Sequence, residues 1–179
     1  MSVSSIGISI TTALVVAACT VAGVAGRPTP SATTATAVLR DPTGRQVGAA
    51  TLVDTYAGVL LTGTISGIGV GAHGIHVHET GKCEAPFASA GGHYNPGKRR
   101  HGFKNPEGHH AGDMPNIDAP ATGELKFEIR ISDVSLTATN RLLDEDGAAL
   151  VIHGAGDDYS TDPSGNSGSR IVCGVINAR

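Results

Sequence analysis

Residues Gly74–Asp113 read GIHVHETGKCEAPFASAGGHYNPGKRRHGFKNPEGHHAGD, and they hold six of the eight histidines in this 179-residue chain. Successive side chains of an extended strand point to opposite faces, so Ile75 and Val77 can enter a core. His76 and His78 then project together from the other face. Neutral imidazole is a common ligand for zinc and copper. Because such a pair can also lie on a wet surface, it indicates either a metal site or a solvated strand face.

The loop after this strand carries further candidate ligands. It is too rich in Gly and Pro for a helix, and loops of this length are usually functional or disordered. A bound metal would supply the order that few apolar residues can provide. Three imidazoles and one carboxylate form a closed tetrahedral set, as in structural zinc sites; they come from His93, His101, His110 and Asp113. His76 and His78 remain for a second metal.

A later histidine is a candidate for that second metal. The segment AALVIHG at residues 148–154 is an apolar strand that ends in His153. A histidine at a strand end is ordinarily satisfied by local hydrogen bonds. Since His76 and His78 lack further ligands, His153 is also a candidate ligand.

The rest of the pattern predicts an all-β fold. Glycine is plentiful, tryptophan is absent, and short alternating segments are separated by turns, which is typical of short strands. The predicted strands are residues 37–40, 46–55, 58–66, 74–79, 123–131, 136–143, 148–153 and 170–176. About eight antiparallel strands without a helical repeat predict a Greek-key barrel or a sandwich.

The N-terminal residues 1–26 are interpreted as a leader. No charged side chain occurs in residues 2–26, and this run could be a buried helix, a membrane span or a targeting segment; its terminal position and small residues favour export. LVVAAC at residues 14–19 resembles a bacterial lipobox, in which the cysteine is lipidated. This predicts membrane attachment through Cys19. Cleavage near Gly26 by an ordinary signal peptidase and retention as an uncleaved anchor are the alternatives.

Residues 27–36, RPTPSATTAT, are predicted to form a solvated linker, followed by one domain over residues 37–179. The formal net charge of −3 gives no general basic surface, which argues against a nucleic-acid partner. There are three cysteines in the chain. An exported protein with two cysteines in its domain invites a disulfide, and lipidation would explain the third.

Six blocks carry a resemblance to a known family. They read HGIHVHE, SAGGHYNP, HGF, HHAGDMPN, LVIHGAGDD and GSRIVCGVI. Together they resemble the copper/zinc superoxide dismutases, in that family's order and nearly its spacing, from about Ala37 to Ile176. The resemblance implies an eight-stranded antiparallel Greek-key β-barrel, similar to an immunoglobulin-like sandwich, with long metal-binding and electrostatic loops.

The resemblance also implies the roles of single residues. Copper ligands would be His76, His78, His93 and His153, and zinc ligands would be His93, His101, His110 and Asp113. His93 would bridge both ions and act as the proton source. Arg170 would bind the substrate anion, Asp157 would hydrogen-bond a histidine of each metal, and Cys83 would pair with Cys173. Among the other histidines, His73 would be buried and structural, and His109 exposed.

The implied activity is the dismutation of superoxide to dioxygen and hydrogen peroxide, which would protect the cell envelope from superoxide in the periplasm or at the cell surface. The loop at residues 154–169 lacks Lys and Arg, so a field that attracts superoxide would come from the metal loop. Its cations are Lys82, Lys98, Arg99, Arg100 and Lys104. Three other functions compete: metal storage or delivery without dismutation, zinc-dependent hydrolysis, and adhesion. The adhesive interpretation leaves the histidines unexplained.

Overall fold

The computed structural model describes Met1 and residues 33–179. The predicted leader with Cys19 lies outside the described residues, as does most of the predicted linker. The first strand begins at Thr34, so the last three residues of that linker belong to a strand instead. In the described part of the chain, no helix is long and apolar enough to cross a membrane.

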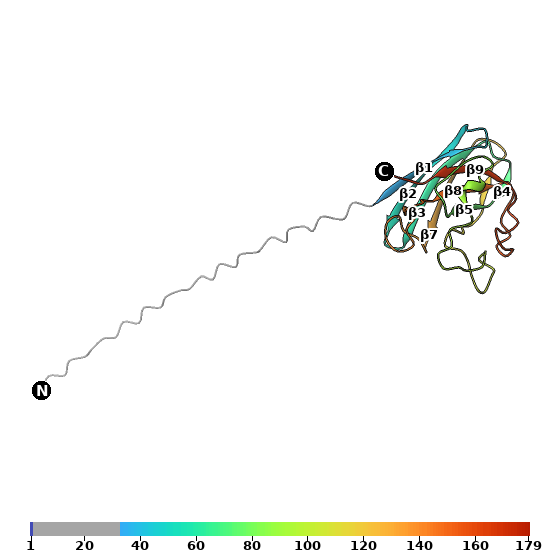
Figure 1. Ribbon diagram of the computed structural model, residues 1–179. Coiled ribbons are helices and arrows are strands. Elements are labelled where there is room, and N and C mark those ends of the chain that lie inside the picture. Colours follow the sequence, from blue (N-terminus) through green and yellow to red (C-terminus); the bar gives the residue numbers. More distant parts are fainter. Residues whose placement is uncertain (2–32) are drawn as a thin grey trace. The chain divides into compact units, whose positions relative to one another are not determined.

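The described domain is built on one curled antiparallel sheet (Figure 1), which confirms the predicted all-β class. Its strand order is β5-β8-β9-β1-β2-β3-β7, with β10 also paired to β1. The strands are β1 (Thr34–Arg40), β2 (Gln46–Thr55), β3 (Gly58–Ser66), β5 (Ile75–His78), β7 (Glu124–Ile131), β8 (Ala149–His153), β9 (Arg170–Val175) and β10 (Asn177–Ala178). A separate ribbon joins β4 (Gly71–His73) to β6 (Ile117–Ala119), and one 3₁₀ turn, η1, covers Ala88–Ala90.

Alternation along the strands creates the core. On β7, Phe127 and Ile131 are buried while Glu128 is exposed, as a half-buried strand requires. Phe127 lies opposite Gly63 on β3, and its ring occupies the space that a side chain at Gly63 would need. The apolar residues of the curled sheet thus form a rigid support on which β5 and β8 carry three histidines.

The predicted strand at residues 136–143 is wrong. The segment folds back on itself, with Leu142 N donating to Ser135 O and Leu143 N donating to Leu136 O. Asn140 takes a positive φ of 52° at the reversal. Leu136 and Leu142 are both fully buried, so these apolar residues fill the core from a turn instead of a strand.

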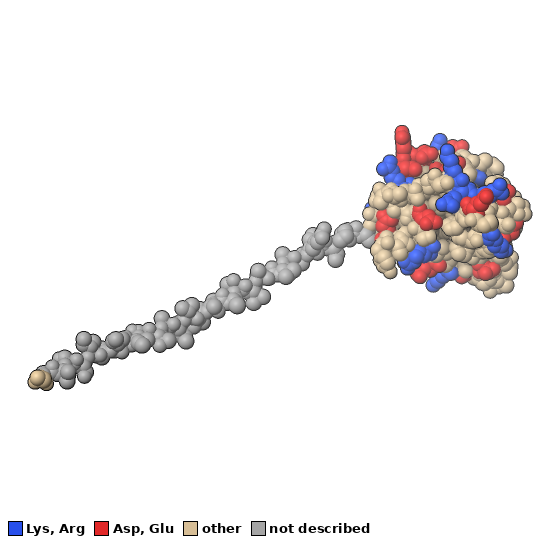
Figure 2. Space-filling model, turned by 90° about the horizontal axis from the view of Figure 1, so that it is seen from below, with Lys and Arg blue, Asp and Glu red and all other residues tan. Residues whose placement is uncertain are grey.

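The loop that follows β5 packs against the loop at residues 154–169. His101 N donates to Asp162 Oδ1 at 2.7 Å, and Lys104 N donates to Tyr159 O at 2.9 Å. Gly102 lies directly against the Tyr159 carbonyl, where a side chain would collide. These contacts fix the loops over β5 and β8. On the face in Figure 2, positive and negative side chains are mixed, and neither sign forms a continuous area.

Candidate metal centre

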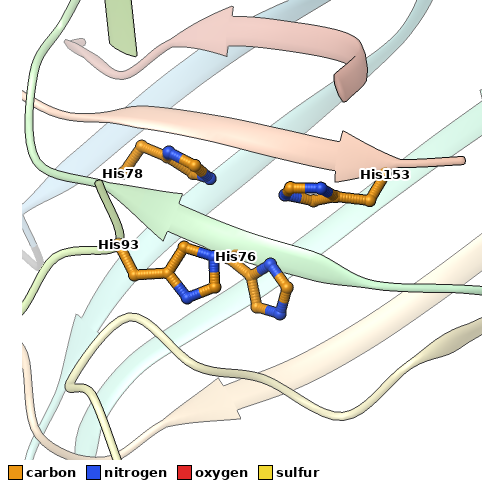
Figure 3. A group of neighbouring side chains, drawn as sticks. All are labelled: His76, His78, His93 and His153. Carbon is orange, nitrogen blue, oxygen red and sulfur yellow. The ribbon is translucent and has the colours of Figure 1, made fainter. Parts of the chain in front are cut away.

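Four histidines converge beside the sheet. His76 and His78 come from β5, His153 ends β8, and His93 comes from the loop (Figure 3). All four are buried, and one ring nitrogen of each lies within 4.8 Å of the others. Alternation on β5 explains the pair, because Ile75 and Val77 occupy the opposite face of the strand and enter the core.

Hydrogen bonds set the tautomers of three of these rings. His78 Nδ1 donates to Gly91 O at 3.0 Å, and His153 Nδ1 donates to Gly168 O at 3.2 Å, since a carbonyl can only accept. His76 Nε2 donates to a carboxylate oxygen of Asp157 at 2.8 Å. The second nitrogen of each ring therefore carries a lone pair and faces the other histidines.

The nitrogens that carry these lone pairs, and Nε2 of His93, form no hydrogen bond with the described residues. His76 Nδ1, His78 Nε2, His93 Nε2 and His153 Nε2 are four of the five buried side-chain polar atoms without a hydrogen bond in the described residues. Each unsatisfied buried group costs about 1–3 kcal/mol. One cation bound by all four nitrogens removes that cost, so these residues fit a copper or zinc ion.

A second set lies next to the first. Asp113 Oδ1 is 2.8 Å from His93 Nδ1, 3.1 Å from His101 Nδ1 and 3.3 Å from His110 Nδ1. The Nδ1 atoms of His93 and His110 are 3.4 Å apart. In a tetrahedron with ligands about 2.0 Å from a zinc ion, neighbouring ligand atoms are about 3.3 Å apart. The second set therefore fits a four-coordinate zinc ion.

His93 belongs to both sets. Its Nδ1 faces Asp113, and its Nε2 faces the histidines of β5 and β8. A ring can bind two ions only after both nitrogens lose their protons, which two adjacent cations make tolerable. His93 is thus placed to bridge two metals.

Asp157 links the two sets a second time. Its Oδ2 accepts from His76 Nε2, and its Oδ1 accepts from His101 Nε2 at 2.9 Å. Asn116 holds the backbone of Asp157 from both sides, accepting from its N–H at 2.8 Å and donating to its carbonyl at 2.9 Å. Gly165 packs so closely on the carboxylate that a side chain there would overlap it. The sequence reasoning missed both Asn116 and Gly165, because only the fold brings them to Asp157.

Burial determines which groups are charged in the metal-free protein. Loss of solvent lowers the pKa of His78 to about 2, and lowers the pKa of His93 and of His153 to about 4, so these rings are neutral at pH 7. Burial opposes ionisation of Asp113, but hydrogen bonds from three histidines outweigh it and hold its pKa well below the usual range. His78, His93 and His153 are therefore neutral donors, and Asp113 supplies a charged carboxylate.

His101 differs from the other ligand candidates. Burial lowers its pKa, but its hydrogen bonds with Asp113 and Asp157 outweigh this and raise the pKa to about 9. At pH 7 His101 of the metal-free protein therefore carries a proton on each ring nitrogen and is positively charged. Zinc has to displace one of these protons, so zinc binding to this set releases a proton.

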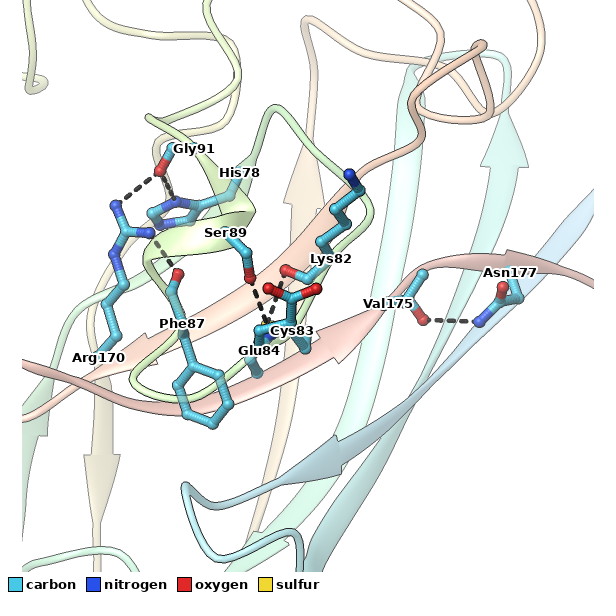
Figure 4. The surroundings of a disulfide bond; sticks show 11 residues. His78, Lys82, Cys83, Glu84, Phe87, Ser89, Gly91, Arg170, Val175 and Asn177 are labelled. Carbon is cyan, nitrogen blue, oxygen red and sulfur yellow. Dashed lines mark hydrogen bonds between the residues drawn. A yellow bond between two sulfur atoms is a disulfide. The ribbon is translucent and has the colours of Figure 1, made fainter.

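Arg170 lies beside the four-histidine set. Its positive charge adds to burial in lowering the pKa of His78 and of His153. Its guanidinium donates to the carbonyls of Phe87 and Gly91, each at 2.6 Å (Figure 4). No pattern of residue types could indicate these acceptors, because they are main-chain atoms.

The remaining histidines lie outside both sets. His73 is buried, with its ring nitrogens 2.7 Å from the carbonyls of His153 and Gly69. His109 is only 27% exposed, because its ring lies against Phe103 and its Nδ1 bonds the His110 carbonyl. The expectation that His109 is exposed is therefore wrong.

The predicted disulfide is confirmed. Cys83 and Cys173 are joined, with Cα atoms 5.7 Å apart and a sequence separation of 90. The bond ties the metal loop to β9, next to the strand that ends in His153 (Figure 4). It therefore restricts the loop that supplies His93.

Comparison with known proteins identifies the family. The family model for copper/zinc superoxide dismutase (SODC) matches residues 46–176. The chain belongs to the copper/zinc superoxide dismutase family. A superoxide dismutase [Cu-Zn] of Aquifex aeolicus is 47% identical over 137 residues, covering 74% of this chain and 81% of the relative. A superoxide dismutase [Cu-Zn] of Caulobacter vibrioides is 42% identical over 147 residues, covering 79% and 84%.

Solved structures agree with this membership. A SOD-like protein from Bacillus subtilis superposes with a TM-score of 0.75 at 41% identity, covering 78% of this chain and 96% of that chain. The Cu/Zn superoxide dismutase from Brucella abortus gives a TM-score of 0.67 at 29% identity, covering 80% and 99%. Copper/zinc superoxide dismutases use copper and zinc, and the two donor sets of this chain fit one ion each.

Proposed function

We propose that the protein converts two superoxide anions and two protons into dioxygen and hydrogen peroxide at a metal pair bridged by His93. Copper would be held by His76, His78, His93 and His153, and zinc by His93, His101, His110 and Asp113. The observation that carries this proposal is that the two ring nitrogens of His93 face two separate, buried donor sets. Family membership supports the activity.

The assignment of the two ions follows from their chemistry. Copper supplies the electron transfer, because it alternates between two oxidation states, whereas zinc has no redox chemistry. The redox ion has to meet the substrate, and Arg170 lies on the four-histidine side, where its charge lowers the pKa of His78 and of His153. The carboxylate-containing set has ligand atoms at spacings that fit a tetrahedral ion, which suits zinc.

His93 handles the proton. Among the described residues its Nε2 has no hydrogen-bond partner, so this atom would take up one proton whenever copper does not occupy it, and would give that proton to the second superoxide. Its Nδ1 stays on the side of Asp113, which keeps the ring in one orientation throughout. The ring therefore carries a proton without turning.

Arg170 orients the substrate. Among residues 33–179, no carboxylate forms an ion pair with its guanidinium, so its charge is available to an anion. Its two carbonyl partners fix the guanidinium plane, and a guanidinium in a fixed orientation suits a small anion. Arg170 would thus position superoxide beside the four histidines.

Metal analysis combined with a superoxide-consumption assay tests the proposal. The wild type should bind one copper and one zinc per chain and consume superoxide, whereas His78→Ala should retain zinc and lose both copper and activity. His109→Ala is the matched control, because this histidine lies outside both sets, and it should behave as the wild type. A wild type with full metal and no activity would favour metal storage instead.

We also propose that the protein works outside the cytoplasm, attached to a membrane through lipidated Cys19. Support comes from the uncharged run in residues 2–26, the LVVAAC segment and the disulfide, which suits an oxidising compartment. The mass of the N-terminal peptide from a membrane fraction tests this. A lipid-modified Cys19, lost together with membrane attachment in Cys19→Ala, is the expected result; a mature chain that starts near Arg27 contradicts it.

A further inference from the structure

Arg170 depends on main-chain acceptors from one short segment. Its Nη1 donates to Phe87 O and its Nη2 donates to Gly91 O, and these two residues flank the 3₁₀ turn η1 (Figure 4). Gly91 O also accepts from His78 Nδ1. The Gly91 carbonyl thus contacts both a proposed copper ligand and the anion-binding side chain. The Phe87 carbonyl accepts the second hydrogen bond from Arg170.

Phe87 has an unusual backbone conformation. Its φ of 72° and ψ of 18° lie in the left-handed region, which is unfavourable for a bulky residue with a Cβ atom. The same carbonyl also accepts from Ala90 N at 3.3 Å and so begins the 3₁₀ turn. A glycine would adopt this conformation without cost. With phenylalanine at this position, contacts of the side chain must offset the cost of the backbone conformation.

The ring of Phe87 provides that compensation. It is 2% exposed and lies in a small apolar cluster separate from the main core. The cluster contains Ala90, Ala149, Val151 and Cys173, with Cys83 packed against it. The ring is therefore anchored on β8, on β9 and on the disulfide, and its own carbonyl points the other way, to Arg170.

We propose that Phe87 is a positioning residue for superoxide binding, and that its buried ring holds its carbonyl against Arg170 so that the guanidinium faces the copper site. This inference rests on the proposed function of Arg170 and adds the side chain that sets its orientation. It predicts that the ring, and not the backbone conformation alone, determines how well an anion binds.

Azide binding to the copper- and zinc-loaded protein, followed by its visible absorption, provides the test. Phe87→Gly permits the same backbone conformation without the ring, and we expect the azide dissociation constant to rise about tenfold, the effect of weakening one charge-assisted hydrogen bond. Phe87→Leu keeps an apolar group in the cluster and should stay within about threefold of the wild type. Phe127→Ala is the control, because it removes a buried phenylalanine ring from β7 and should leave azide affinity unchanged.

A double-mutant comparison shows whether the effect acts through Arg170. In an Arg170→Gln background, Phe87→Gly should produce no further loss of azide affinity; a further loss means a general structural effect and overturns the proposal. Wild-type affinity in Phe87→Gly also overturns it. If Phe87→Gly fails to load copper, Phe87→Ala takes its place, because alanine keeps the Cβ atom at the same backbone conformation and lacks the ring; a rise of at least about threefold is expected. Failure of the proposed function is separate, since it appears as a wild type that binds azide but does not consume superoxide.

Discussion

Replacement of Asp157 by asparagine should weaken copper binding more than zinc binding. Oδ1 of Asp157 accepts from His101 Nε2 at 2.9 Å and from Tyr159 N at 2.6 Å, whereas Oδ2 accepts from His76 Nε2 alone. An amide oxygen would therefore occupy the Oδ1 position, where it satisfies two donors. The amide nitrogen then faces His76 Nε2–H, and two donors cannot bond.

His76 can restore a hydrogen bond to this amide only by moving its proton from Nε2 to Nδ1. Nδ1 is the nitrogen that faces the copper set, so the proton would compete with the metal. A hydrogen bond to a charged group contributes about 1.5–3 kcal/mol, which corresponds to a loss of about 10- to 100-fold in copper affinity. His101 keeps an acceptor, although a neutral one, so zinc affinity should fall by less than about tenfold.

Competition with chromogenic chelators measures the two affinities separately. Asp158→Asn is the matched control, because its exposed carboxylate bonds Thr161 and Asn166 and touches neither donor set. We expect this control to bind both metals as the wild type does. Unchanged copper affinity in Asp157→Asn, or a larger loss of zinc than of copper, would refute the tautomer argument.

Three further predictions follow from the same contacts. In the metal-free protein, burial keeps the pKa of His93 and of His153 at about 4, against an ordinary 6.5, so the unfolded chain binds more protons below pH 6.5. The free energy of unfolding, measured with denaturant, should therefore fall as the pH drops from 6.5 to 4, by about 2 kcal/mol per histidine at pH 5, and a flat profile contradicts this. Replacement of both Cys83 and Cys173 by serine should lower the free energy of unfolding by up to about 4–5 kcal/mol, and an unchanged denaturation midpoint argues against a closed bond. Arg99→Gln should lower the rate of superoxide consumption and its salt dependence more than Arg100→Gln, because Arg100 is paired with Glu107 at 3.2 Å; equal rates for wild type and Arg99→Gln exclude that role.

The ligand strand was predictable from sequence because its chemistry follows a strict period of two. Ile75 and Val77 alternate with His76 and His78, and the observed β5 keeps that alternation. The class of fold followed from similar patterns in the longer strands. The clustering of His93 with residues far along the chain was suggested by residue type and by the family resemblance, and the structure brings these residues together.

Other features depended on tertiary contacts. The apolar residues Leu136 and Leu142 predicted a strand, but they reach the core from a reversal stabilised by Ser135 and Asn140. Strands of two or three residues, such as β6 and β10, carry too few side chains to show a period. The carbonyl of Phe87 is a main-chain group that every residue has, so no side-chain pattern could reveal its contact with Arg170.

Diffraction from crystals of the metal-loaded protein, recorded at the copper and zinc absorption edges, tests the shared ligand most directly. The expected result is copper at Nε2 of His93 and zinc at Nδ1 of the same ring, with Asp113 on the zinc. Two ions without a common ring, or a His93 ring turned away from either ion, would contradict the account.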